Sequence, residues 1–425
     1  MRLLLVSDVA DTGFGRVGKE LGRRLLALGW DVRVLGINYR GLDGELGAVI
    51  ARGGGPAEIR ARLDVLEADP LTPRMLSAGG DLGISLLPHA IRGNLRPWNG
   101  WRPERVLLIR DPRAVMDMLI RDQGACAEVP TFNYVPIEGR ALPLLWRELW
   151  RQVIPVAMSE FGQRELQALL GHEVPLIHHG VSDGFFPLSV TAPGAWRGQT
   201  VTSRDGAKRA LGWEGRTVLF RADRFNERKN YGALFRIADP VLAAHPEALL
   251  VIHASVQDEG GDMLELLSRM TGAENVEYTW RHPQVFFTRL HDTWTGLGDV
   301  ELNTLYNAAD LYVSPTMAEG FGLTLAESLA VGVPVVATDY SSIPEVVGPG
   351  GILVPPAYHM TNVYAHEWAL VDEAQFSAAI ERLVSKPALR RELGEAGRRH
   401  VAQFRWQDAA DQFHALMQTP VAVAA

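Results

Sequence analysis

Short apolar runs alternate with amphipathic stretches along most of the chain. The first run is Leu3 to Val6, and the stretch after it carries leucines at helical spacing, at positions 21, 25 and 28, before Gly29. Further runs typical of buried strands lie at 32–35, 106–109, 153–157 and 176–178. Strands that alternate with helices predict a mostly parallel, doubly wound sheet.

This alternation breaks between residues 185 and 215 and then begins again. The stretch is rich in Gly, Thr and Ser, and we interpret it as an interdomain linker. Beyond it, strands are predicted at 217–221, 248–254, 275–278, 311–314 and 334–337. Helices are predicted after Asp299 as N-cap, over 323–331, and from 373 to about 417. The sequence therefore predicts an α/β protein of two Rossmann-like, doubly wound domains, 1–190 and 210–402.

Composition and charge narrow the class of protein. The 425 residues carry 42 Lys+Arg and 50 Asp+Glu, a net charge of −8. Residues 1–185 hold 22 of each sign, so neither half has the basic excess usual for a nucleic-acid-binding domain. The single cysteine, Cys126, excludes an intramolecular disulfide and a Cys-rich zinc site. No apolar run approaches the ~18 residues of a transmembrane helix. We expect a cytoplasmic protein, with peripheral attachment to a membrane left open.

A glycine-rich turn follows the first predicted strand. Gly13, Gly15 and Gly18 fit the dinucleotide fingerprint, and the same stretch with Lys19 fits most of a P-loop. A P-loop needs Ser or Thr where Glu20 stands, and a dinucleotide site needs an acidic residue near Asn38. Two alternatives remain for this loop. It binds the cofactor of an NAD(P)-dependent oxidoreductase, or it is a tight turn that binds no ligand. Glycines before a helix N-terminus would also suit an anion or a sugar hydroxyl.

A second glycine-containing turn lies between a predicted strand and helix. It reads Glu319-Gly320-Phe321-Gly322-Leu323-Thr324-Leu325-Ala326-Glu327 and follows the strand at 311–314. This is the carboxyl edge of a parallel sheet, where ligands bind. The glycines allow close backbone approach, and the helix N-terminus favours an anion. Two carboxylates beside such a site need hydroxyl donors, which a sugar and a ribose supply. The alternative is a helix start with two solvated glutamates.

Basic residues follow the strand at 217–221. Arg224 and Lys229 are spaced so that a loop and the next helix N-terminus can bring both to one diphosphate. A charged loop on its own is usually solvated. In the same domain as the Glu319 turn, the pair favours a diphosphate site.

These motifs together resemble those of retaining GT-B glycosyltransferases, particularly family 4. The turn from Glu319 to Glu327 is similar to the E-x7-E signature of that family. Other stretches similar to the family are the Arg224/Lys229 pair, Met158 to Gly162, His179-Gly180-Val181, Gly332 to Asp339, Pro344 to Val347 and Phe404-Arg405-Trp406. His178-His179 and Ser182 depart from its usual Pro-Asn and Asp. The resemblance spans nearly the whole chain and is densest from 217 to 350.

The resemblance implies a GT-B fold whose last helix, about 403–425, crosses back to the first domain. It implies a UDP- or GDP-sugar donor held by the second domain, with retention of anomeric configuration. Arg224 and Lys229 would neutralise the leaving diphosphate, Glu319 would contact the donor sugar, and Glu327 the ribose. The backbone from Gly320 to Thr324 would complete the donor pocket, and Gly13, Phe14 and Gly15 would close over it. It also implies independence of metal, and the chain contains no D-x-D.

The acceptor side is less defined. Asp111 and Glu138 follow predicted strands of the first domain, and with His179 they are the acceptor-side candidates. Segment 92–121 contains seven arginines and two tryptophans, which would suit an anionic lipid, a phosphorylated acceptor or nucleic acid. A loop with structural Trp and solvated Arg is the alternative. The neutral first domain favours a carbohydrate or small-molecule acceptor over either polyanion.

Overall fold

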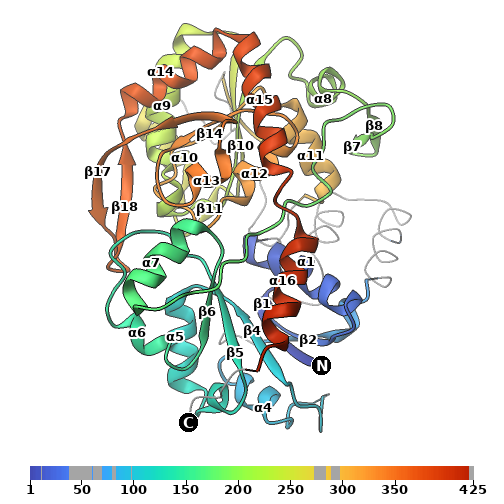
Figure 1. Cartoon of the computed structure of the whole chain (residues 1–425). Helices are drawn as coiled ribbons and strands as arrows, with labels where there is room; N and C mark the ends of the chain where they lie inside the picture. Colours follow the sequence, from blue (N-terminus) through green and yellow to red (C-terminus); the bar gives the residue numbers. More distant parts are fainter. Residues whose placement is uncertain are drawn as a thin grey trace.

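Two parallel β-sheets, one in each domain, face each other in the computed structural model (Figure 1). The structure describes residues 1–10, 12–37, 60, 69–78, 83–96, 98–271, 284–288 and 297–420. The predicted strand at 275–278 and position 38 lie outside these residues. Within them, no helix is long and apolar enough to cross a membrane.

The sheet of the first domain has the strand order β3-β2-β1-β4-β5-β6, with all neighbours parallel. Its strands are β1 (Arg2–Asp8), β2 (Asp31–Ile37), β3 (Met75–Ser77), β4 (Arg105–Ile109), β5 (Thr131–Val135) and β6 (Ile154–Ala157). Its helices are α1 (Gly13–Ala27), α4 (Leu87–Ile91), α5 (Pro112–Arg121), α6 (Trp146–Leu149) and α7 (Glu160–Leu170), with 3-10 turns η1 (Thr72–Arg74) and η2 (Ala125–Glu128).

The second domain repeats this order as β13-β10-β9-β14-β15-β16, again all parallel. Its strands are β9 (Thr217–Ala222), β10 (Ala248–His253), β13 (Val285–Phe287), β14 (Leu311–Ser314), β15 (Val335–Thr338) and β16 (Gly351–Val354). Its helices are α8 (Arg204–Leu211), α9 (Tyr231–Ala244), α10 (Met263–Thr271), α11 (Asp299–Ala308), α12 (Leu323–Ala330), α13 (Ile343–Val347), α14 (Glu373–Val384) and α15 (Pro387–Val401), with 3-10 turn η3 (Glu227–Lys229). Two-stranded hairpins are β7 (Gly194–Trp196) with β8 (Gln199–Val201), β11 (Gln257–Asp258) with β12 (Gly261–Asp262), and β17 (Pro356–Thr361) with β18 (Glu367–Val371).

Alternation along the strands explains why both faces of each sheet are covered. In β1, Leu3 and Leu5 enter one apolar cluster, whereas Leu4 and Val6 enter another, and all four are fully buried. Successive strand side chains point to opposite faces, so a run of four apolar residues requires helices on both sides. The predicted doubly wound α/β architecture is confirmed.

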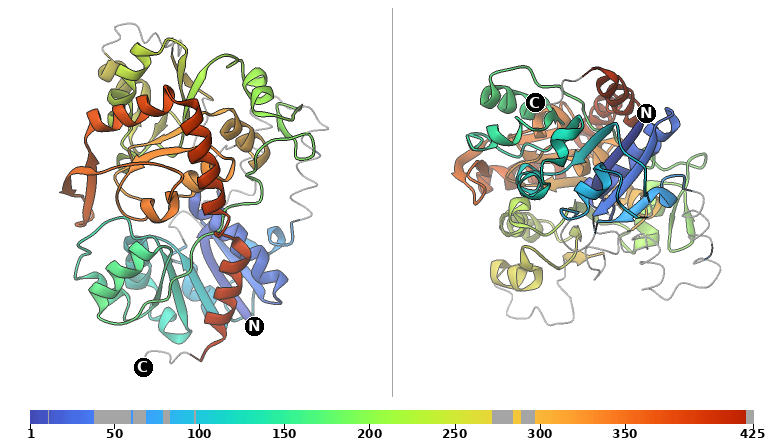
Figure 2. Two further views of the ribbon diagram at one scale, coloured as in Figure 1. Left: turned by 45° about the horizontal axis from the view of Figure 1, so that its top comes forward. Right: turned by 90° about the horizontal axis from the view of Figure 1, so that it is seen from below.

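The last helix, α16 (Trp406–Gln418), crosses from the second domain back to the first, as Figures 1 and 2 both show. Trp30 Nε1 donates a hydrogen bond to His414 Nδ1 over 2.9 Å, and Arg105 Nε donates to the Met417 carbonyl over 2.7 Å. These contacts fix α16 against α1 and the edge of β4. The crossing helix expected from the resemblance is therefore present, over a shorter range than 403–425.

Two local predictions differ from the structure. Asp299 is the first residue of α11 and not its N-cap, a position that Gly298 takes, because the Asp299 carboxylate pairs with Arg16. The stretch 185–215, predicted as linker, contains the β7–β8 hairpin and α8. Ser203 caps α8 by accepting from Gly206 N, and Gly212 ends it in the left-handed region. Ser203 and Gly212 are thus the two ends of a helix, and Gly198 lies in the turn of the hairpin.

Candidate functional site: the cleft between the domains

A cleft of about 1200 Å³ lies between the two domains and is lined by residues of both. In each sheet the strand order reverses beside the first strand, between β1 and β4 and between β9 and β14. Open α/β sheets bind ligands in the crevice outside the carboxyl ends of strands at this switch point. The segments that follow these four strands all contribute to the cleft. The fold thus places both ligand-binding edges around one cavity.

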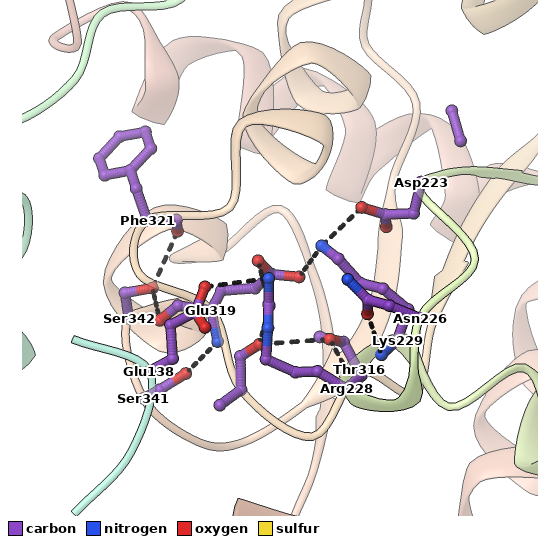
Figure 3. Close-up of polar contacts among 12 residues, drawn as sticks. Glu138, Asp223, Asn226, Arg228, Lys229, Thr316, Glu319, Phe321, Ser341 and Ser342 are labelled. Atoms are coloured by element: carbon purple, nitrogen blue, oxygen red, sulfur yellow. Dashed lines mark hydrogen bonds and ion pairs between the residues drawn. The ribbon is translucent and has the colours of Figure 1, made fainter. Parts of the chain in front are cut away.

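Glu319 lies in the turn after β14, with only 6% of its surface exposed. Its carboxylate accepts from Arg228 over 2.8 Å and from Lys229 over 2.6 Å (Figure 3). Its main chain is fixed as well, because its N–H donates to Ser341 and its carbonyl accepts from Ser342. Burial would raise its pKa, but the attraction of the two cations lowers it to about 2. Glu319 is therefore a fixed, ionised hydrogen-bond acceptor at neutral pH.

Lys229 is held between two carboxylates. Its Nζ lies 2.6 Å from Asp223 Oδ1 and 2.6 Å from Glu319 Oε1 (Figure 3). Asp223 also pairs over 3.0 Å with the fully buried Arg221 at the end of β9. Asn226 caps the 3-10 turn η3 that carries Lys229. The ammonium is therefore positioned by charge from both sides, in a buried pocket rather than on an open loop edge.

Arg224 lies further out on the cleft wall. Its guanidinium pairs with Asp258 over 2.8 Å and with Glu259 over 3.1 Å, and 40% of its side chain is exposed. The structure thus brings Lys229 to Glu319 but places Arg224 with other partners. Arg228, which was not among the predicted site residues, takes the position beside Glu319. In the sequence, only its place next to Lys229 points to this role, and the spacing of the basic residues does not favour Arg228 over Arg224.

Glu327 lies on α12 and is 3% exposed. It accepts a hydrogen bond from Tyr306 over 2.8 Å and pairs over 3.1 Å with Arg16, which comes from α1 of the first domain. Arg16 also pairs with Asp299 over 3.0 Å. Burial raises the pKa of Glu327 to about 7, and Arg16 and Tyr306 offset that effect only in part. No pattern in the sequence indicates that Arg16, Asp299 and Tyr306 meet at Glu327.

The glycines of the two turns have different roles. A Cβ on Gly320 would lie 2.5 Å from Pro136 Cβ of the first domain, and Gly322 has a φ of +101°, so both positions require glycine. The residues from Gly320 to Thr324 all line the cleft at the start of α12, as predicted for a donor pocket.

The Gly13 turn is only partly directed at the cleft. Gly13 and Phe14 line the cavity, but Gly15 is buried, and a Cβ there would lie 1.9 Å from the Ala10 carbonyl. A Cβ on Gly18 would lie 2.5 Å from Ser7 Oγ. Gly15 and Gly18 therefore allow α1 to pack against the end of β1. This corrects the prediction of Gly15 as a residue that covers the donor.

The three acceptor-side candidates all line the cleft. Asp111 caps α5 by accepting from Ala114 N over 2.9 Å. Glu138 pairs with Arg228 over 2.9 Å, and burial raises its pKa despite that pairing. His179 is buried, which lowers its pKa to about 3, so the ring is neutral. Because the Tyr134 hydroxyl donates to the Ile177 carbonyl, His179 Nδ1 must donate to that hydroxyl, and Nε2 is left as an acceptor.

Segment 92–121 does not form one basic and aromatic surface. Trp98 and Trp101 are 7% exposed, and the Arg33 guanidinium lies 4.7 Å from the Trp101 ring. Trp101 Nε1 donates to Asp31 over 2.8 Å. The structure therefore supports the structural interpretation of both tryptophans. Trp146 and Trp150 likewise pack edge to face at 6.0 Å, although Trp146 also lines the cleft.

Over the described parts of the chain, no group of three or more His, Cys, Asp or Glu side chains could hold a metal ion. The arrangement can neutralise a diphosphate through Lys229 and its neighbouring arginines. It can also accept hydroxyl hydrogen bonds through Glu319 and Glu327.

Comparisons with known proteins agree with this arrangement. The chain has the GT-B fold: it superposes on sucrose-phosphate synthase from Thermosynechococcus elongatus with a TM-score of 0.65 at 20% identity, over 98% of both chains. Residues 203–400 match the family Glycosyl transferases group 1.

Several curated proteins match this chain in sequence, and two of them illustrate the extent of the match. The MMP alpha-(1->4)-mannosyltransferase of Mycolicibacterium hassiacum is 36% identical over 134 residues, 31% of this chain and 29% of that protein. The D-inositol 3-phosphate glycosyltransferase of Corynebacterium jeikeium is 29% identical over 240 residues, 54% of this chain and 51% of that protein. The chain thus spans about half, or less, of the length of these relatives.

Proposed function

We propose that this chain transfers a sugar from a nucleotide-sugar donor, a UDP- or GDP-sugar, to a carbohydrate or small-molecule acceptor, with retention and without a metal ion. The single observation that carries the proposal is the cluster of Glu319, Lys229 and Arg228 at the carboxyl edge of the second sheet. Glu327 lies on α12, the helix that follows the Glu319 turn. The glycosyl-transferring relatives support this reading, and an oxidoreductase gains no support from them.

The proposed mechanism places the donor along the second domain. Lys229 would receive the diphosphate as negative charge develops on it, which stabilises the leaving group in an oxocarbenium-like transition state. Glu319, ionised and fixed by two cations, would accept hydrogen bonds from sugar hydroxyls. Glu327 would accept from the ribose. Stabilising charge that is already positioned costs no reorganisation when the bond breaks.

If the reaction proceeds with retention as proposed, the character of Glu319 favours same-face attack over a double displacement. Its carboxylate is engaged with Arg228 and Lys229, and its low pKa makes it a weak nucleophile. A double displacement needs a carboxylate free to attack the anomeric carbon. Same-face attack by the acceptor, assisted by the leaving diphosphate, needs no such group. The phosphate oxygen would take the acceptor proton as the donor bond breaks and the new glycosidic bond forms.

A thermal-shift panel of UDP-, GDP- and ADP-sugars against NAD tests the proposal. A ligand of the native state at 100 times its Kd adds about 2.7 kcal/mol to the free energy of unfolding. We expect one nucleotide sugar to raise Tm and NAD to leave it unchanged. Stabilisation by NAD alone would overturn the proposal in favour of an oxidoreductase.

A further inference from the structure

Arg110 is a buried cation that the proposed mechanism does not use. It directly follows β4, at the switch point of the first sheet, and its side chain lines the cleft. It is 8% exposed, and its Nε has no hydrogen-bond partner. Among the described residues no carboxylate forms an ion pair with it. A buried charge is costly unless it is paired, so this exception requires an explanation.

Two other arginines that line the cleft and are largely shielded from solvent are neutralised by carboxylates. Arg16, whose side chain is 22% exposed, pairs with Glu327, and Arg228, whose side chain is 14% exposed, pairs with Glu138 and Glu319. Arg110 therefore differs from its neighbours in the same cavity. Because Arg110 lies at the wall of the cleft, a bound ligand could supply the negative charge that compensates its guanidinium.

Further groups that favour an anion lie next to Arg110. Helix α5 begins at Pro112, and Pro112, Arg113 and Ala114 line the cleft. The N-terminus of a helix carries partial positive charge and favours anions. Arg113 is exposed to the cleft and pairs with no carboxylate in the described part of the chain. We call Arg110 together with residues 112–114 the Arg110 site.

Acidic groups also face this region and must be considered. Asp111 uses one carboxylate oxygen to cap α5, and Glu138 is paired with Arg228. Their remaining oxygens suit hydroxyl donors. Across the cleft, the buried Nε1 of Trp368 and both ring nitrogens of His366 have no partner, and both residues line the cavity. This part of the cleft therefore offers cations that could bind one anionic group of a ligand, and polar groups that could bind its hydroxyls.

We propose that the Arg110 site binds an anionic group, a phosphate ester or a carboxylate, of a hydroxyl-bearing acceptor. This inference rests on the proposed function and names the chemical class of its acceptor: a phosphorylated or carboxylated sugar or polyol. An arginine guanidinium can donate two parallel hydrogen bonds to two oxygens of a phosphate or of a carboxylate. The site belongs to the first domain, across the cleft from Lys229, so the anion is that of the acceptor and not the donor diphosphate.

The test uses the full chain saturated with the nucleoside diphosphate that stabilises it, so that the Lys229 pocket is occupied. Glucose 6-phosphate, glucuronate and glucose are then titrated by calorimetry into the wild type, Arg110→Gln and Arg121→Gln. Arg121 is the matched control, an exposed arginine at the other end of α5 that does not line the cleft. Glucose 6-phosphate and glucuronate distinguish a phosphate from a carboxylate as the group bound.

We expect at least one of the two anions to bind the wild type and Arg121→Gln, and to bind Arg110→Gln at least tenfold more weakly. Glucose should bind all three more weakly than that anion. Because Arg110 has no carboxylate partner, Arg110→Gln should keep or raise the Tm of the unliganded protein. Arg113→Gln, an exposed change, should weaken anion binding in the same direction.

Equal anion affinity in Arg110→Gln and the wild type, or no anion binding to the wild type, would overturn the inference. The nucleotide titration separates this failure from that of the proposed function. A wild type that binds a nucleotide sugar but neither anion refutes the Arg110 site alone. A wild type that binds no nucleotide sugar refutes the proposed function itself.

Discussion

Arg16 Nη1 of the first domain lies 3.1 Å from Glu327 Oε1 of the second, across the cleft in which the donor is proposed to bind. The pair joins the two glycine-containing turns, because Arg16 lies on α1 and Glu327 on α12. The carboxylate that would receive the ribose is thus engaged by a cation from the opposite domain. If Glu327 binds the ribose as proposed, donor binding and the relative position of the domains would be coupled through this contact.

The first prediction concerns pH. The pKa of Glu327 is raised to about 7 from 4.5 by burial, so only at higher pH is it a full acceptor for ribose hydroxyls. We expect nucleotide affinity, measured by calorimetry, to rise between about pH 6 and pH 8. In Arg16→Gln the midpoint should move to higher pH, because a cation that favours the carboxylate is lost.

The control for this prediction is Glu327→Gln, whose affinity should be low and independent of pH. The free energy of unfolding depends on pH in the opposite direction to nucleotide affinity. Between pH 4.5 and about 7 the folded protein keeps a proton that the unfolded chain releases, so this group's contribution to stability falls as pH rises. A wild-type affinity that stays constant from pH 6 to 8 contradicts the assignment of Glu327.

The second prediction concerns the cations of the donor site. Lys229→Ala should lower kcat by a hundredfold or more, ~3 kcal/mol, as when one transition-state charge partner is lost. It should also lower Tm, because Asp223 and Glu319 lose the ammonium between them and breaking a buried pair costs about 3–5 kcal/mol. Arg224→Ala should lower kcat less and change Tm little, since its guanidinium pairs with Asp258 and Glu259 at the cleft wall and its side chain is 40% exposed. Near-normal turnover in either variant would remove that residue from the mechanism.

The third prediction concerns metal. Transfer should continue in excess EDTA, because cationic side chains rather than a divalent ion are proposed to neutralise the diphosphate. Initial rates with and without EDTA, and after addition of manganese, measure this directly. Loss of activity in EDTA with recovery in manganese would show that an ion is required.

The fourth prediction concerns the approach of the domains. A Cβ on Gly320 would lie 2.5 Å from Pro136 Cβ, so Gly320→Ala must separate the Glu319 turn from the first domain. We expect kcat to fall about tenfold or more, since misplacement by ~1 Å is costly in catalysis. Gly232→Ala, in α9, is the matched control, because its Cβ would meet nothing nearer than 3.6 Å. Equal kcat in both variants and the wild type would show that the contact has no role in catalysis.

Much of the fold could be predicted because its signals are local. The run from Leu3 to Val6 is apolar at every position, which only a strand covered on both faces requires, and the structure buries all four. The turn from Glu319 to Glu327 was predicted for the same reason, since its glycines and carboxylates are consecutive. The alternation of strands with helices predicted the parallel, doubly wound character of each sheet, and the order of the strands came only from the structure.

The contacts between the domains could not be predicted, because they depend on side chains distant in sequence. Nothing in the sequence around Arg16 indicates a partner, yet it meets Glu327 and Asp299. Arg228 and Arg224 are equally basic, and only the turn of η3 decides which one reaches Glu319. Charge spacing along a loop does not determine the direction of each side chain.

The most direct measurement of the central claim is release of nucleoside diphosphate from the nucleotide sugar that stabilises the protein, followed by ³¹P NMR. The wild type should release it slowly without acceptor, and ¹H NMR should show the product sugar first with the anomeric configuration of the donor. Glu319→Gln and Lys229→Ala should release it at least a hundredfold more slowly, whereas Gly232→Ala should match the wild type. Release at the wild-type rate by both site variants would contradict a glycosyl-transfer site built on Glu319 and Lys229.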